Sequence, residues 1–374
     1  MKTRKDPTIS FHIRYKIAAI SILLQVIITT HGFGQEYLKL PAPTWKIEPV
    51  RYRIATITDD RSNKSIVGCV SASGKRTDLK FESSLQEVLW EHLSIGLSGD
   101  TSHTAPLHLH IVKFNLQDQV NGSKHKISLD QQYNIYRSLD GKEQKLFEFP
   151  YRVSLDASGN RPLGILEKLV TQSLEALMKQ FNDWADENPG QVYFMNHLQI
   201  HLTGDDTFAN RSQGDTILWS KDYRLSWKDF KGKDASNSPF SAQSNCIYTL
   251  KTIPSFSNDT MHITILLHPC FTRGASWVHL DALQDSLLMH EQLHFDLCEL
   301  FGRKFREKLD RANFSFLEYG GEINELFNQH WTEYRNSQNQ YDEETQHGII
   351  RDQQNAWMEQ VRKELNELAR YGVE

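Results

Sequence analysis

Two histidines that flank a glutamate are the residues of this chain best suited to chemistry. His290, Glu291 and His294 form the pattern His-Glu-x-x-His inside the apolar run Leu287–Asp296. Positions i and i+4 share one face of an α-helix, so both rings can bind one zinc ion, and Glu291 lies about 100° around the helix. The pattern predicts zinc-assisted hydrolysis, with Glu291 as the general base that acts on a metal-bound water.

The same helix face also allows a purely structural interpretation. Apolar residues continue the stripe of the two histidines at spacings of three and four: Leu283, Leu287, Leu297 and Phe301. Buried imidazoles need partners, which core hydrogen bonds could supply instead of a metal. Of the two interpretations, we expect metal ligation. Asp296 and Glu299 point roughly 140–160° away from the stripe, so neither should bind the same ion.

A catalytic zinc site normally has a third protein ligand and a fourth position that is open to water. His347 is the predicted third ligand, because it lies in the segment Tyr341–Gly348, where one intervening helix can return the chain to the metal. Imidazole is a common zinc ligand. The alternatives are acids of the intervening helix or of the turn-like stretch expected after it: Glu322, Glu325, Asp342, Glu343 and Glu344.

The residues around these positions resemble a known family. The matching segments are Trp219-Ser220-Lys221, Leu225–Phe230, Ser276-Trp277-Val278, His290–Asp296 and Tyr341-Asp342-x-x-Thr345-x-His347-Gly348. Over roughly residues 215–370 the chain resembles the bacterial family of predicted secreted zinc-dependent proteases, which is catalogued as a domain of unknown function. The resemblance supports a zincin-like metallopeptidase domain.

The first residues predict export. Basic residues precede the apolar run Ile17–Thr30, and Gly32 and Gly34 follow it. A basic start, an apolar run of this length and small residues at its end are typical of a secretory signal peptide, here residues 1–34. An uncleaved signal anchor is the alternative. No second apolar stretch approaches membrane length, so we expect a secreted or periplasmic protein without a membrane span after signal removal.

The net charge indicates the type of partner, and the cysteine spacing indicates whether disulfides form. The net charge of −5 becomes −9 when residues 1–34, with five basic residues and one acid, are removed. An acidic mature chain argues against nucleic acid and leaves a peptide or protein substrate as the expected partner. The four cysteines lack the spacing of a metal or disulfide framework. Cys246 and Cys270 could pair in an exported protein; otherwise we expect free buried thiols.

The remaining chain predicts two α+β domains that position these residues. Residues 36–190 alternate strand and helix patterns, and the polar segment Asp186–Gly190 ends the domain. We find no chemical constellation in this half. Its expected strands are 51–57, 65–70, 107–111, 131–137 and 144–155, and its expected helices are 81–97 and 163–184.

Residues 191–374 are the predicted zincin-like domain, with an active-site helix at 281–309. Strands are expected at Cys246–Thr252 and Met261–Pro269, and helices also at 322–336 and 348–371. Met261–Pro269 is the candidate edge strand for aligning an extended peptide. The alternatives to a peptidase are a non-catalytic envelope binding module with a structural or vestigial zinc site and a zinc hydrolase of cell-wall amides.

Overall fold

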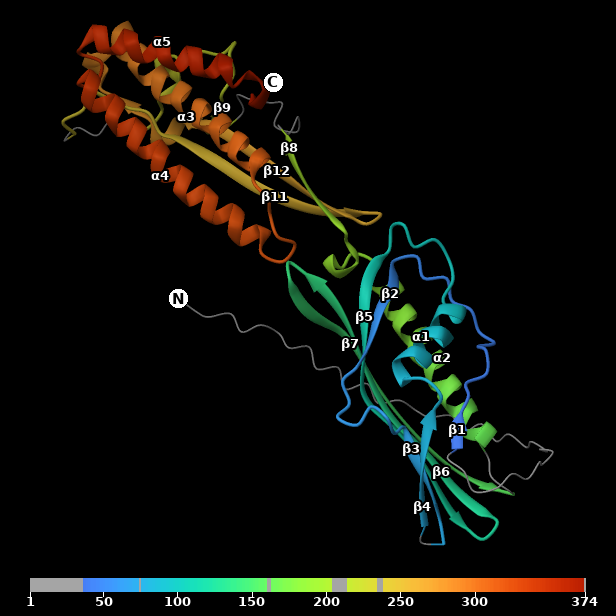
Figure 1. The fold of residues 1–374 in the computed structure, drawn as a ribbon. Helices are drawn as coiled ribbons and strands as arrows, with labels where there is room; N and C mark the ends of the chain where they lie inside the picture. The colour runs from blue at the N-terminus through green and yellow to red at the C-terminus, as the bar shows by residue number, and fades with distance from the viewer. Residues whose placement is uncertain (1–35, 74, 160–162, 204–213, 234–237, 373–374) are drawn as a thin grey trace.

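The computed structural model describes residues 36–73, 75–159, 163–203, 214–233 and 238–372. The chain forms an elongated molecule with a large sheet at one end and a group of long helices at the other (Figure 1). This mixture confirms the predicted α+β class. The predicted signal peptide lies outside the described residues. No helix within the described ranges is long and apolar enough to cross a membrane.

The first part of the chain builds a seven-stranded mixed sheet. Its order is β1-β4-β3-β5-β6-β7, and β2 pairs in parallel with β5. The long strands alternate buried and exposed side chains, so the apolar face of the sheet lies against the core. The strands are β1 (Glu36–Leu38), β2 (Tyr52–Asp59), β3 (Gly68–Ala72), β4 (Lys75–Phe81), β5 (Ala105–Asn121), β6 (Lys124–Leu139) and β7 (Lys142–Ser158).

Two amphipathic helices accompany this sheet, α1 (Leu85–Gly96) and α2 (Leu163–Glu187). Ser84 begins α1 with a capping box: its hydroxyl accepts from the backbone N–H of Glu87 at 3.2 Å, and the Glu87 carboxylate accepts from the N–H of Ser84 at 3.0 Å. The buried stripe of α2 packs on the sheet, as in the edge-to-face contact of Phe181 with Tyr52, whose ring centroids are 4.7 Å apart.

A second, smaller sheet supports the predicted site. The strands β11 (Cys246–Ser257) and β12 (Thr260–Thr272) form the expected hairpin. β8 (His197–Thr203) and β9 (Thr216–Leu218) pair with the other side of β12, so β12 is an interior strand. The prediction that Met261–Pro269 is an edge strand is therefore wrong, because both of its backbone edges are hydrogen-bonded. β11 pairs only with β12, so one of the free edges of this sheet belongs to β11.

Three helices pack beside this sheet: α3 (Asp285–Arg311), α4 (Tyr319–Thr345) and α5 (Arg351–Glu367). The helix α4 runs well past the predicted end at Asn336, because the stretch 337–343 contains neither glycine nor proline and continues the helical hydrogen bonds. The expected turn at 337–343 is wrong. The helix ends where Gln346, His347 and Gly348 take positive φ angles of 48°, 55° and 84°.

Several direct contacts join the two parts of the molecule. At the turn between β6 and β7, the Asp140 carboxylate accepts hydrogen bonds from the backbone N–H groups of Phe316 (3.2 Å) and Leu317 (3.1 Å), in the loop between α3 and α4. Arg137 donates to the carbonyl of Met195 at 3.0 Å. One apolar core runs through the junction, since it includes residues of the large sheet, the hairpin and α3.

The cysteines are free thiols, in agreement with the second of the two expectations. In the hairpin, Cys270 stands opposite Ile247, and Cys246 stands opposite Phe271. Neighbouring residues of a strand point to opposite faces, so the Cys246 and Cys270 side chains leave the hairpin on different sides. The pairing of Cys246 with Cys270 does not form.

Candidate metal centre

The helix α3 is fixed by an apolar core and by hydrogen bonds on the face opposite the two histidines. Leu293, and Leu297 on the histidine stripe, are buried in a second apolar core. Gln292 accepts from the backbone N–H of Leu225 at 2.8 Å and donates to Asp296 at 2.9 Å. Asp296 also accepts from the indole of Trp219 at 2.8 Å. The segment that precedes the hairpin therefore binds the side of α3 that carries Gln292 and Asp296, and the side that carries the two histidines faces the cleft.

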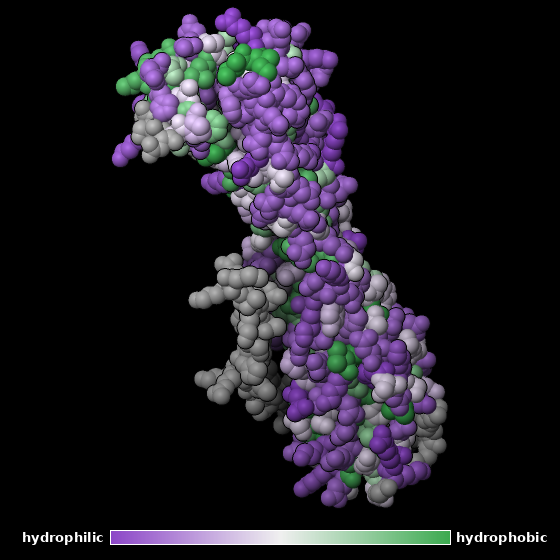
Figure 2. Space-filling view, turned by 90° about the vertical axis from the view of Figure 1, so that its left-hand side faces the viewer, coloured by the Kyte–Doolittle hydropathy of each residue, from purple (hydrophilic) through white to green (hydrophobic). Residues whose placement is uncertain are grey.

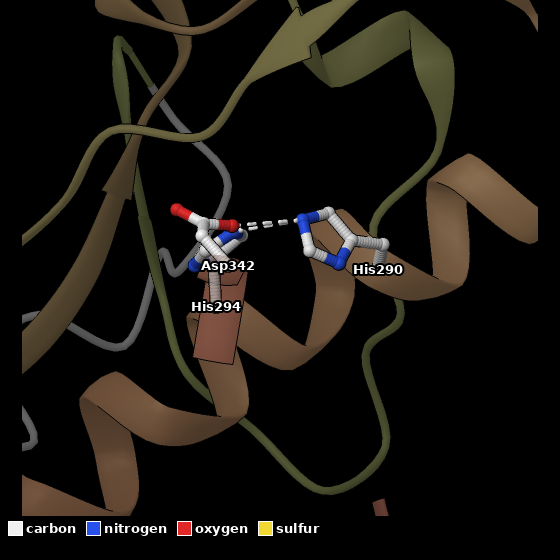
Figure 3. A group of neighbouring side chains, drawn as sticks. All are labelled: His290, His294 and Asp342. Carbon is white, nitrogen blue, oxygen red and sulfur yellow. Dashed lines mark hydrogen bonds and ion pairs between the residues drawn. The ribbon is translucent and has the colours of Figure 1, made fainter. Parts of the chain in front are cut away.

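Three ligand atoms meet in front of α3 (Figure 3). Nε2 of His290 lies 3.1 Å from Nε2 of His294, and Oδ1 of Asp342 lies 3.1 Å from the first and 3.0 Å from the second. The histidines come from α3 and Asp342 comes from the last turn of α4. These atoms form a nearly equilateral triangle.

The outer ring nitrogens are held by two glutamines. The Gln338 amide donates to the carbonyl of His294 at 3.0 Å, which turns its oxygen towards Nδ1 of the same ring. The oxygen of Gln354 lies 3.3 Å from Nδ1 of His290. Nδ1 of each ring thus faces a glutamine oxygen, and each Nε2 faces into the triangle, where a metal ion could take the place of a proton. This is the arrangement that a metal-binding histidine requires.

The triangle has the size and charge that a small divalent cation needs. Ligands at 2.0–2.1 Å from a tetrahedral zinc lie about 3.3 Å apart, close to the 3.0–3.1 Å found here. Burial opposes ionisation of Asp342, but its hydrogen bonds with His290 and His294 hold its pKa well below the usual range. Burial lowers the pKa of His294, but the Asp342 hydrogen bond and the charge of Glu291 raise it to about 9. The site thus favours a positive charge at its centre.

The predicted third ligand, His347, lies at the rim of this triangle. Its Nδ1 is 3.4 Å from Oδ1 of Asp342, and its side chain is 50% exposed. The ring packs against Phe240, with the centroids 4.8 Å apart. Gly348 brings the chain so close to His290 that an added Cβ would lie 3.0 Å from the Cβ of that histidine. The group of mutually close ligand atoms therefore contains Asp342 and leaves His347 beside it.

The other carboxylates named from the sequence fall into two groups. Glu322 and Glu325 lie 17–20 residues before Asp342 on the continuous helix α4. Along the helix axis they are therefore roughly 25–30 Å from Asp342. Glu322 bonds there to the backbone N–H of Ser315 at 2.9 Å. Asp342 itself was among the alternatives. The sequence signal for it is that Gln338 and Asp342 are four residues apart, which is visible only if the helix is assumed to continue.

Glu291 is buried beside the two histidines. The side chain is 3% exposed, and its Oε2 has no hydrogen-bond partner among the described residues. A buried carboxylate oxygen without a partner is costly unless a ligand or water completes it. The same residue lines the cleft beside both histidines. It is therefore available to a water molecule bound at the triangle.

Tyr341 has a packing role. It is 0% exposed, and its ring stacks on His290 with the centroids 4.7 Å apart. Its hydroxyl lies 2.7 Å from the oxygen of Gln354 and 3.2 Å from the carbonyl of His290. The hydroxyl is thus turned away from the cleft and cannot reach an oxyanion there. Tyr341 fixes the ring plane of His290.

The triangle opens into a cleft of about 820 Å³. One wall is the segment 239–247, which leads into the edge strand β11, and the other is the last four turns of α4 with the turn that follows. Phe240 and Ile349 line the cleft and are 45% and 76% exposed. On the face drawn in Figure 2, apolar side chains gather at the end of the molecule that carries α3, α4 and α5. A volume of this size lies within the range of about 300–1,000 Å³ that is usual for ligand-binding clefts.

Comparisons with known proteins agree with the sequence resemblance at the level of an uncharacterised family. Residues 272–348 match the model of a bacterial protein family of unknown function, DUF922, and this stretch contains all the ligand candidates of the triangle and its rim. No curated protein matches the chain. The match supports a relation of this stretch to an uncharacterised bacterial family and gives no activity.

Two solved structures are similar over part of the chain. One is an uncharacterised protein with 10% identity, which covers 39% of this chain and 97% of its own, at a TM-score of 0.25. The other is protein XCC0632 from Xanthomonas campestris, of the family DUF330, with 13% identity, coverage of 39% and 94%, and a TM-score of 0.26. TM-scores this low carry no argument about the fold.

Proposed function

We propose that this protein is an exported zinc-dependent metallopeptidase. The observation that carries the proposal is the inward-facing triangle of His290, His294 and Asp342 in an open cleft, with Glu291 beside it. A zinc ion bound there would polarise the carbonyl of a peptide bond and lower the pKa of a coordinated water towards ~7. Export rests on the signal-like pattern of residues 1–34.

The surroundings of each side chain in the cleft indicate its role in the proposed reaction. Glu291, buried and with one free oxygen, accepts the proton of the attacking water and passes it to the leaving amine. Asp342 is held ionised by the two imidazoles and serves as a ligand rather than as an acid. His347 is half exposed at the rim, and we assign it the role of hydrogen-bond donor to the carbonyl oxygen of the substrate.

The open cleft supports a catalytic site over a structural zinc site. A structural site closes the coordination sphere with four protein ligands. The group found among the described residues has three, and the cleft gives access to the fourth position. Hydrolysis of a cell-wall amide would use the same residues, and no contact in the cleft favours it. A peptide is favoured because the cleft is walled by the segment before the edge strand β11, as strand addition would need.

The test combines metal content with cleavage of a peptide library. The Glu291→Gln variant should keep its zinc and lose cleavage by about 10² or more, because only the proton acceptor is removed. Glu343→Gln is the matched control, since Glu343 is exposed on the last turn of α4 and does not line the cleft. Equal cleavage by Glu291→Gln and the wild type would refute the general-base role. A zinc-loaded wild type that cleaves no peptide would refute the peptidase.

A further inference from the structure

Two arginines are the only positively charged side chains, apart from histidines, among the described residues that line the cleft. Arg335 lies on α4, and Arg351 is the first residue of α5. The acids of the described lining are Glu291 and Asp342, which belong to the metal centre. Away from the metal, the cleft therefore carries positive charge, although the whole chain has a net charge of −5.

Both arginines are exposed and have no hydrogen bond or ion pair within the described part of the chain. The neighbours of Arg335 at three and four residues along α4 are Trp331, Thr332, Gln338 and Asn339, none of which is acidic. Arg351 has Gln354 and Asn355 at the same spacings. Only neighbours at these spacings face each other on a helix. By contrast, Arg303 and Arg306 of α3 lie 2.7 Å and 3.7 Å from the Glu299 carboxylate.

We propose that Arg335 and Arg351 bind carboxylate side chains of the substrate, so that the cleft selects acidic peptides. This inference rests on the proposed peptidase function. An unpaired guanidinium in a cleft offers up to two parallel hydrogen bonds to a carboxylate, which gives both affinity and orientation.

The geometry of α4 places the acidic residue along the substrate. Arg335 precedes Asp342 by seven residues, which is about two helical turns, so both side chains share one face and lie ~10 Å apart along the axis. An extended peptide advances ~3.4 Å per residue. The residue that meets Arg335 is therefore about three positions from the cleaved bond. Arg351 follows the turn at His347 and Gly348, so it would bind a carboxylate of the part of the substrate that lies beyond that turn.

The experiment uses a labelled, otherwise neutral peptide in which one glutamate, or a glutamine in its place, is moved through successive positions. Cleavage is measured with the zinc-loaded wild type, and binding is measured by fluorescence anisotropy with the zinc-loaded Glu291→Gln variant. The glutamate peptide should be preferred about tenfold in kcat/KM at its best position. In Arg335→Gln or Arg351→Gln the preference should fall below about threefold at the peptide position that the replaced arginine contacts. Arg362→Gln, an exposed arginine of α5 outside the cleft, should retain it.

The two measurements separate the inference from the proposed function. Cleavage without a preference for glutamate, or a preference that survives in the double variant, would overturn the role of the arginines and leave the peptidase intact. A glutamate-dependent affinity that the arginine variants lose, without cleavage, would keep the acidic-peptide site and refute the peptidase. Neither cleavage nor binding would overturn both.

Discussion

Replacement of Asp342 by asparagine tests the composition of the metal centre most directly. The change keeps the shape of the side chain and removes the negative charge that faces the two Nε2 atoms at 3.0–3.1 Å. The pKa of His294 rises from 6.5 to about 9 in this setting, so the site stabilises one positive charge by roughly 3 kcal/mol. The carboxylate is the main source of that stabilisation.

The expected loss of zinc affinity in Asp342→Asn is therefore at least about 10²-fold, since a divalent ion depends on the same charge more than a proton does. His347→Ala should lower the affinity by less than about tenfold, because that ring lies at the rim and is half exposed. Affinities are measured by competition with a chromophoric chelator at pH 7.5, with Glu343→Gln as the control. Circular dichroism of each metal-free variant verifies folding.

The reverse result would refute this assignment of ligands. If His347→Ala loses zinc and Asp342→Asn binds it like the wild type, His347 is the third ligand, as the sequence predicts, and Asp342 only orients the imidazoles. If both variants lose zinc to the same extent, the two residues bind together and the fourth position is not free for water.

Two further predictions concern the turn after α4 and the core behind it. Gly348→Ala should lower zinc affinity and stability, by about 1–2 kcal/mol in unfolding, because φ is +84° and the new Cβ would meet His290; the metal-free and zinc-loaded proteins are compared by urea unfolding. Burial lowers the pKa of His330 to about 4, so the folded state keeps a neutral ring where the unfolded chain, at 6.5, binds a proton. His330 therefore leaves the free energy of unfolding unchanged above pH ~6.5 and lowers it by roughly 3 kcal/mol as the pH falls towards 4. Urea unfolding of the metal-free His330→Gln variant, which lacks this titration, should show a correspondingly smaller loss; an equal loss would contradict the role of His330.

The sequence predicts the pattern on α3 well because that pattern is local. His290 and His294 need only a helix to share a face, and the helix is indicated by its apolar stripe. Asp296 and Glu299 face away from the metal, as the helical spacing predicts. Asp296 bonds to Trp219, and Glu299 bonds to Arg303. The hairpin of β11 and β12 could also be predicted from the sequence, since two strand-like runs are separated by a short polar turn.

The identity of the third ligand and the choice of the edge strand depend on contacts between residues that are far apart in the sequence. Polar residues between Ser337 and Glu343 resemble a turn, yet contacts with α3 and α5 keep them helical, and this brings Asp342 rather than the ring of His347 into the triangle. The position of β12 inside the sheet is set by β8, a strand far earlier in the chain whose pairing no local pattern reveals. Propensity yields to tertiary packing in both cases.

The helices α3 and α4 are connected twice, once at each end. The loop between them is held by Asp140 at the end nearest the large sheet, and the ligands of the metal centre meet at the other end (Figure 1). A bound ion would act as a cross-link that closes a ring of chain between His294 and Asp342 and restricts the unfolded ensemble. Such an ion would tie together the ends of α3 and α4 that lie away from the large sheet, so its removal should make these ends the first part of the helix pair to open.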